Sequence, residues 1–125
     1  MLRNKDAVAN VAVKDLEAAR RFYRDTLGLT QVDAEGEELI VFGSGKSLLN
    51  VYRSRYAGTN QATAVTWDVG DDIEDAVRKL KAKGVAFEHY DWPDMKRDGD
   101  IHVAGDMKVA WFKDPDGNIL NLVGR

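Results

Sequence analysis

The sequence predicts an α+β fold in which one βαβββ module occurs twice. Two similar stretches, Asp15-Leu-Glu-Ala-Ala19 and Asp72-Ile-Glu-Asp-Ala76, start 57 residues apart in a chain of 125. An apolar, strand-like run precedes each stretch, and three further strand-like runs follow it. We therefore expect a single domain, residues 1–125, made of two modules at about residues 5–53 and 62–124.

Each module contains one amphipathic helix. Asp15 can accept hydrogen bonds from the free N–H groups of a first turn, so the first helix begins there, and Gly28 ends it. The second helix is expected over residues 71–83, ahead of Gly84. Each helix has a single apolar stripe, so it must lie on one face of its sheet. The other face of each sheet is then left to curve around a cavity.

Turn signals separate the expected strands from one another. Asp114-Pro-Asp-Gly117 predicts a tight turn, because Pro and Gly adopt the backbone angles that a reversal requires. The polar run at residues 54–61 is expected to link the two modules, and the Asp- and Gly-rich segment at residues 91–106 is expected to be a long loop. The expected strands cover residues 7–13, 29–33, 39–42 and 47–53 in the first module, and 64–69, 85–90, 107–113 and 118–123 in the second.

Composition excludes several classes of function. Hydrophobic residues make up 44% of the chain, which is enough for a packed core. The net charge of −3 argues against a nucleic-acid partner, because such proteins carry a basic face. With no cysteine, the chain has neither disulfides nor thiolate metal sites, and it has no apolar run that could span a membrane. We expect a cytoplasmic protein with no nucleic-acid or membrane partner.

Four motifs connect the chain to a known family. They are Val13-Lys-Asp-Leu-Glu-x-Ala19, Phe22-Tyr-Arg-Asp-Thr-Leu-Gly-Leu29, Val69-Gly-Asp-Asp-Ile-Glu-x-Ala76 and Phe112-Lys-Asp-Pro-Asp-Gly-Asn118. Together they resemble the vicinal oxygen chelate superfamily, which includes glyoxalase I, bleomycin-resistance proteins, fosfomycin-resistance transferases and extradiol dioxygenases. The resemblance implies tandem βαβββ modules whose curved sheets form a U-shaped cavity for a small molecule. It also implies a homodimer.

The resemblance also indicates where a metal ion would be bound. Metal-dependent members use one His or Glu from each of four strands, but the matching residues here are two alkyl side chains and two neutral amides. Such side chains cannot hold a divalent ion, and His89 and His102 lie elsewhere in the sequence. We therefore expect no metal and no cofactor. The four matching positions are Val8, Asn50, Ala64 and Asn121.

Strand alternation identifies the side chains expected to face a ligand. Trp67 should lie under a helix, whereas its neighbours Thr66 and Asp68 should face the cavity. Alternation alone does not decide the side of Trp111. The resemblance favours the cavity, because an aromatic residue ten positions before the fourth ligand leans into the site of related dioxygenases, but packing beneath the helix fits nearly as well. The expected ligand-binding residues are Asn10, Asn50, Tyr52, Thr66, Trp92, Trp111 and Asn121.

Two residues are candidates for acid–base chemistry. Asp68 is a carboxylate expected to face the cavity, where burial would prepare a general base, although carboxylates near strand ends are usually solvated. His102 could carry protons, although a histidine in a polar loop is more often simply exposed. Trp92 and Met95 could form a lid over an apolar ligand, or belong to an ordinary loop with one anchoring tryptophan.

Three functions remain open at this point. The first is metal-independent binding of a small apolar or aromatic molecule, as in drug-sequestering resistance proteins. The second is a metal-independent lyase or isomerase that uses Asp68 or His102 as a base. The third is a metal-dependent lyase or dioxygenase with relocated ligands. Because the amide and aromatic residues are those of a ligand pocket, we rank binding first.

Overall fold

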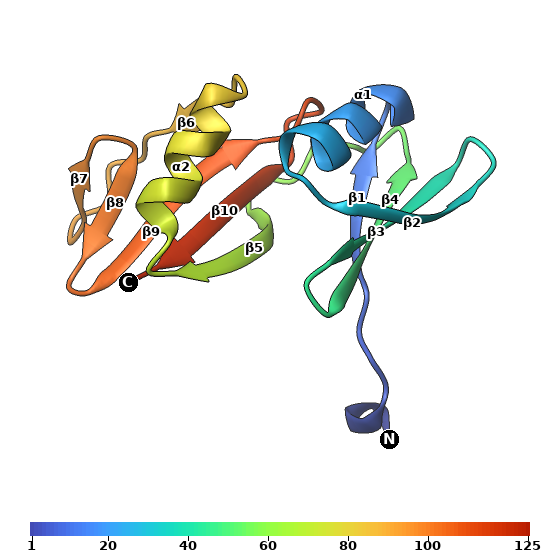
Figure 1. Cartoon of the computed structure of the whole chain (residues 1–125), viewed down its shortest axis with the longest axis horizontal. Coiled ribbons are helices and arrows are strands. Elements are labelled where there is room, and N and C mark those ends of the chain that lie inside the picture. The colour runs from blue at the N-terminus through green and yellow to red at the C-terminus, as the bar shows by residue number, and fades with distance from the viewer. The chain divides into compact units, whose positions relative to one another are not determined.

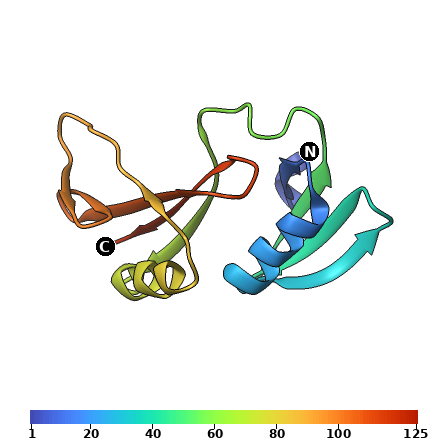
Figure 2. The same ribbon diagram turned by 90° about the horizontal axis from the view of Figure 1, so that it is seen from above.

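The computed structural model describes residues 1–125 as two compact units, residues 1–59 and 60–125 (Figure 1). Their boundary falls in the polar run between the two modules. Each unit is α+β and contains one curved, mixed sheet, and a helix lies along one face of it (Figure 2). None of the helices is long and apolar enough to cross a membrane.

The sheet of the first unit has the strand order β1-β4-β3-β2. β1 and β4 are parallel, and the other pairs are antiparallel. A short 3₁₀ turn at Leu2–Asn4 precedes the sheet. The elements that follow are β1 (Ala9–Val13), α1 (Leu16–Arg20), a π-helical segment (Arg21–Thr26), β2 (Thr30–Glu35), β3 (Leu39–Ser44) and β4 (Ser47–Arg53).

The first helix begins as the sequence predicts. The Asp15 carboxylate accepts hydrogen bonds from the backbone N–H groups of Glu17 and Ala18, at 3.0 and 3.2 Å. The expected single helix is instead a five-residue α-helix followed by the wider π-helical segment, in which Tyr23 is completely buried. Gly28, at φ +80°, ends it. The core residues of this unit are Val11, Val13, Leu16, Ala19, Tyr23, Ile40, Phe42, Leu49 and Val51.

The sheet of the second unit has the strand order β5-β10-β9-β8-β7, and β6 also pairs with β9. β5 and β10 are parallel, as β1 and β4 are in the first unit. The elements are β5 (Thr63–Gly70), α2 (Ile73–Ala82), β6 (Phe87–Glu88), β7 (Lys96–Asp98), β8 (Ile101–Ala104), β9 (Met107–Lys113) and β10 (Ile119–Gly124).

The start of α2 differs from that of α1. The side chain of Asp72 makes no capping hydrogen bond, so the second copy of the motif lacks the cap of the first. Ile73 is instead fully buried and fixes the first turn against the sheet. Gly124 allows this close approach, because a Cβ there would lie 2.3 Å from the carbonyl oxygen of Gly70 and 3.0 Å from the Cβ of Ile73.

Two expectations for the second module are wrong in detail. Residues 91–106 are not a loop throughout, since they contain the hairpin of β7 and β8. All three residues of β7 are exposed, so this edge strand lacks the apolar alternation that would have revealed it. The strand expected over residues 85–90 is also shorter, and only Phe87–Glu88 pair with β9.

Candidate functional site

Each sheet has one face that packs against its helix and an opposite face, which we call the helix-free face. The helix-free faces of the two sheets carry most of the predicted ligand-binding residues. In the first unit, Asn10 and Asn50 are paired across β1 and β4 and share this face, while Val11 and Val51 are buried on the helix side. Asn50 Nδ2 donates to Asn10 Oδ1 at 3.3 Å. Asn10 Nδ2 in turn donates to the carbonyl of Val8. The two amides therefore satisfy part of each other's hydrogen-bonding needs.

A second row of predicted residues crosses the helix-free face of the other unit. Asn121 on β10 is paired with Thr66 on β5 and with Trp111 on β9. Their neighbours point the other way, and Trp67 stacks on Phe112 on the helix side, with ring centroids 6.5 Å apart. Trp111 therefore lies on the helix-free face, in register with Thr66 and Asn121.

Aromatic side chains gather around Trp111. The ring of Trp92 is parallel to that of Trp111, with an interplanar angle of 3° and centroids 6.2 Å apart. Tyr90 and His102 both meet Trp111 edge to face, at centroid distances of 5.3 and 4.9 Å. We call Tyr90, Trp92, His102 and Trp111 the aromatic cluster. Trp92 lies in the segment between β6 and β7 and is 55% exposed.

A hydrogen bond fixes the direction of the Trp111 indole. Its Nε1–H donates to the Thr63 hydroxyl on β5, at 3.2 Å. Because β10 lies between β9 and β5, the indole must reach across β10, the strand that carries Asn121. Asn121 is 8% exposed, and its Oδ1 has no hydrogen-bond partner. A buried carbonyl oxygen without a partner is uncommon and requires an explanation.

The sequence suggested that His102 lies in an exposed loop, but the structure places it elsewhere. It is on β8 and is 1% exposed. Its Nε2 accepts the backbone N–H of Tyr90 at 2.9 Å, and its Nδ1 is buried without a hydrogen-bond partner. This bond holds Tyr90 beside Trp111. The signal that could have placed it is the short apolar alternation Ile101-His-Val-Ala104.

Asp68 is also not the buried carboxylate that the sequence suggested as a general base. The side chain is exposed, and its Oδ1 accepts the backbone N–H of Gly70 at 3.1 Å. Asp68 therefore stabilises the end of β5. This is the solvated alternative that strand-end carboxylates usually adopt.

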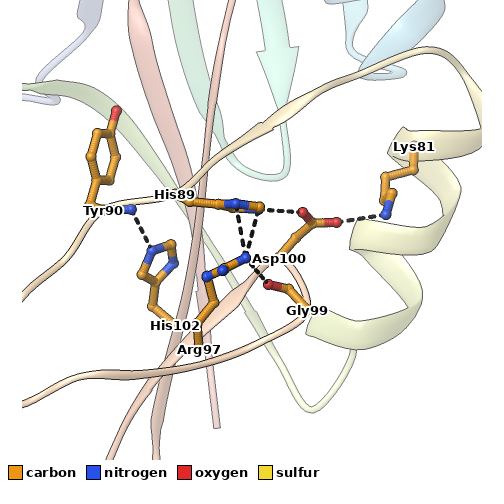
Figure 3. Close-up of polar contacts among 7 residues, drawn as sticks. All are labelled: Lys81, His89, Tyr90, Arg97, Gly99, Asp100 and His102. Carbon is orange, nitrogen blue, oxygen red and sulfur yellow. Dashed lines mark hydrogen bonds and ion pairs between the residues drawn. The ribbon is translucent and has the colours of Figure 1, made fainter.

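A polar network at the β7–β8 hairpin has no counterpart among the residues proposed from sequence (Figure 3). Asp100 lies between Lys81 of α2, whose Nζ is 2.7 Å from Oδ2, and His89, whose Nε2 is 2.8 Å from Oδ1. The Lys81 ammonium, and then His89, hold the pKa of Asp100 below its ordinary value. Arg97 Nη1 lies 2.9 and 3.3 Å from the two ring nitrogens of His89, so the guanidinium lies over the ring rather than in its plane.

The positions that match the metal ligands of related proteins do not suit a cation. Val8 is exposed and precedes β1, and Ala64 carries no donor atom. The remaining donors are the neutral amides of Asn50 and Asn121, whereas divalent ions require imidazole nitrogen or carboxylate charge. No group of three or more His, Asp or Glu side chains is arranged to hold a metal elsewhere in the chain.

Comparison with known proteins connects this architecture to one family. Residues 6–122 match the family model described as Glyoxalase/Bleomycin resistance protein/Dioxygenase superfamily. Among curated proteins, none matches the chain significantly.

Three solved structures with this fold have diverse names, and each of the three is under 25% identical to the chain, so they show the fold alone. Lactoylglutathione lyase from Agrobacterium tumefaciens has 21% identity and a TM-score of 0.72, covering 97% of this chain and 93% of its own. The fosfomycin resistance protein FosX from Listeria monocytogenes has 14% identity and a TM-score of 0.74, covering 98% and 93%. The antibiotic-binding protein TnmS3 from Streptomyces sp. CB03234 has 21% identity and a TM-score of 0.67, covering 99% and 98%.

Proposed function

The chain belongs to the Glyoxalase/Bleomycin resistance protein/Dioxygenase superfamily, and we propose that it binds a small aromatic or apolar molecule without a metal ion. The observation that carries this proposal is the aromatic cluster beside the buried, unpaired amide of Asn121. Flat apolar rings with a few fixed polar groups are the usual composition of a ligand site. TnmS3, an antibiotic-binding protein to which the chain is structurally similar, agrees with this class of function.

Stacking supplies the affinity in this proposal. Trp111 and Trp92 offer parallel ring faces, and aromatic side chains contribute both buried area and favourable ring geometry. Thr66 and Asn121 supply polar groups that orient the ligand. Asn10, Asn50 and Tyr52 are proposed ligand contacts of the first module, on its own helix-free face.

We propose binding without a metal because of the side chains at the four positions where the family resemblance expects His or Glu ligands. These positions carry two amides and two alkyl groups instead. Elemental analysis of the purified protein tests this part. Stoichiometric zinc, nickel, iron or manganese would overturn it. A homodimer, expected from the family resemblance, stays a prediction that light scattering would check.

Calorimetric titration with a panel of planar aromatic compounds, from naphthalenes to anthraquinones, tests the binding function. We expect saturable binding that Trp111→Leu weakens. Tyr56→Leu is the control, because Tyr56 is exposed in the segment between the modules and lies outside the aromatic cluster. If no member of the panel binds, the proposed function is wrong.

One observation favours a second candidate, a metal-independent lyase or isomerase. His89 is 44% exposed at its side chain and is oriented by Asp100 through a 2.8 Å contact, which is the arrangement of a histidine general base. Arg97 Nη1 lies 2.9 Å from His89 Nδ1, so in this alternative the guanidinium moves aside when the nitrogen acts as a base. His89 therefore replaces Asp68 and His102 as the base in this alternative.

Proton exchange measures this activity directly. Incubation in D₂O with small α-hydroxy ketones and aldehydes should produce deuterium exchange at the α-carbon, observed by NMR. His89→Gln should abolish the exchange, whereas Asp68→Asn should leave it unchanged. Exchange that survives in His89→Gln would remove the histidine from this role.

A further inference from the structure

Two buried asparagines on the β9–β10 hairpin have opposite surroundings. Asn118 is 7% exposed, and its Nδ2 donates to Asp114 Oδ2 at 2.8 Å. Asn121 is 8% exposed, yet its Oδ1 has no partner within the protein. Burying a carbonyl oxygen without a donor destabilises the folded chain, so Asn121 is a poor choice for packing alone. Its oxygen has the chemistry of an acceptor that awaits an external donor.

The surroundings of Asn121 restrict what that donor can be. Trp111 and Thr66 flank it in register on the neighbouring strands. The nearby ring faces of Trp111 and Trp92 favour a flat aromatic body. A carbonyl oxygen attracts an O–H or N–H group and repels an anion, so a phenol suits it and a phenolate or carboxylate does not.

We infer that the ligand of this helix-free face is an uncharged hydroxyaryl molecule, whose hydroxyl group donates a hydrogen bond to Asn121 Oδ1. This inference rests on the proposed binding function and names its ligand class. The carboxamide of Asn121 would recognise the ligand hydroxyl by this hydrogen bond, because its oxygen is the buried acceptor without a partner on that face.

The inference has a structural requirement at Trp111. The indole reaches across β10 to the Thr63 hydroxyl, and Asn121 Oδ1 is closed to solvent. In this proposal the ligand reaches the oxygen when Trp111 gives up its hydrogen bond to Thr63, and it then stacks on the displaced indole. The Thr63 hydroxyl therefore acts as a latch on the site.

Three probes with one ring system test the ligand class: 1-naphthol, 1-methoxynaphthalene and naphthalene, titrated calorimetrically at neutral pH, where 1-naphthol is uncharged. All three should bind through stacking. We expect 1-naphthol to bind about tenfold more tightly than 1-methoxynaphthalene, because only the former can donate to Asn121. This comparison uses the unmodified protein, so it does not depend on whether any variant folds.

Two variants assign the preference to one side chain. Asn121→Leu should still bind all three probes but should reduce the preference for 1-naphthol to less than about twofold, since the acceptor is gone and the volume is kept. Asn118→Leu is the matched control. It removes a buried amide that is already bonded to Asp114, so it should lower the thermal midpoint and keep the tenfold preference.

The outcomes separate the inference from the function on which it rests. If none of the probes binds, and the wider aromatic panel also fails, the proposed function is lost. If the three probes bind equally to the unmodified protein, or if Asn121→Leu keeps the preference, binding stands and the hydroxyaryl inference is overturned. Thr63→Val should tighten 1-naphthol binding severalfold, and an unchanged affinity would overturn the latch.

Discussion

The two modules share one architecture but treat equivalent polar positions differently. Asn10 and Asn50 of the first module correspond in register to Thr66 and Asn121 of the second. In the first pair, one amide donates to the other at 3.3 Å. In the second pair, the buried oxygen of Asn121 has no partner. The comparison indicates that the first face largely satisfies its own amides, whereas the second leaves an acceptor for a ligand.

The second module also contains an element that the first lacks. The β7–β8 hairpin adds two strands to its sheet, and Asp100 in the turn ties that hairpin to α2 and to His89. The segment before the hairpin carries Trp92. The aromatic cluster therefore depends on an insertion, which gives the two faces different chemistry despite a common fold.

The largest expected effect is a loss of ligand affinity when an aromatic side chain is removed. This loss should differ between the helix-free faces of the two modules. Trp111→Leu should weaken 1-naphthol binding by about 2 kcal/mol, close to 30-fold, because both a stacking partner and apolar area are lost. Tyr52→Leu, at a proposed ligand contact on the helix-free face of the first module, should weaken the affinity less than Trp111→Leu does. Isothermal calorimetry measures both. An equal or larger loss in Tyr52→Leu would move the main site to the first module.

The next effect concerns the inserted hairpin. Asp100→Asn should lower the free energy of unfolding by about 1 kcal/mol at neutral pH, because a carboxylate that is only 15% exposed loses its contacts with the more exposed Lys81 and His89. Asp98→Asn, on the exposed strand β7, should change it by less than about 0.5 kcal/mol. Urea titrations provide both values. Similar losses in the two variants would show that general charge, and not the Asp100 network, stabilises the hairpin.

The loss of stability in Asp100→Asn should also depend on pH. Lys81 and His89 lower the pKa of Asp100 in the folded state. Stability from this carboxylate is therefore fully present above the unfolded-state pKa of ~3.9, and it is lost as the pH falls towards the lower folded-state value. The stability difference between the wild type and Asp100→Asn should shrink as the pH drops below about 4. A difference that stays constant as the pH falls well below about 4 would contradict the assignment.

A smaller effect distinguishes the two helix starts. Asp15→Ala should destabilise the first unit by about 1 kcal/mol, because two N–H groups lose their acceptor. Asp72→Ala should have almost no effect, since the side chain of Asp72 makes no capping bond. Thermal denaturation followed by circular dichroism compares them. Equal losses would mean that Asp72 caps α2 after all.

The smallest expected effect is the coupling energy between the side-chain amides of Asn10 and Asn50. A double-mutant cycle with Asn10→Ala and Asn50→Ala should give a coupling energy of about 0.5 kcal/mol, as expected for one partly exposed hydrogen bond. The equivalent cycle at Thr66 and Asn121 should give a coupling near zero in the absence of ligand. Significant coupling there would indicate a direct bond between the two and weaken the case for an external donor.

Local patterns were sufficient to predict much of this fold. Asp15 caps α1 because a carboxylate bonds the nearest N–H groups, a matter of a few neighbouring residues. Ser47–Arg53 forms β4 with the bounds predicted from its apolar residues and the preceding Gly43-Ser-Gly45 turn signal. Strand alternation, with Ala64 assigned to the cavity by the family resemblance, correctly placed Trp67 on the helix side of its sheet.

Other features depend on contacts that no local pattern contains. The network of Lys81, His89, Arg97 and Asp100 unites residues from α2, β7 and two connecting segments, so only the tertiary fold brings them together. His102 was misplaced because its strand is only four residues long and follows an exposed edge strand. The side of Trp111 required the register between β9 and β10, which sequence spacing alone did not supply.

The parallel rings of Trp92 and Trp111 have a spectroscopic consequence. Two parallel indoles whose centroids are 6.2 Å apart couple their electronic transitions, so they contribute jointly to the circular dichroism of the protein. Any event that turns one ring changes this exciton coupling, and with it the near-ultraviolet dichroism and the fluorescence of the protein. The chain thus contains its own optical reporter, which requires no added dye to register the movement of Trp111.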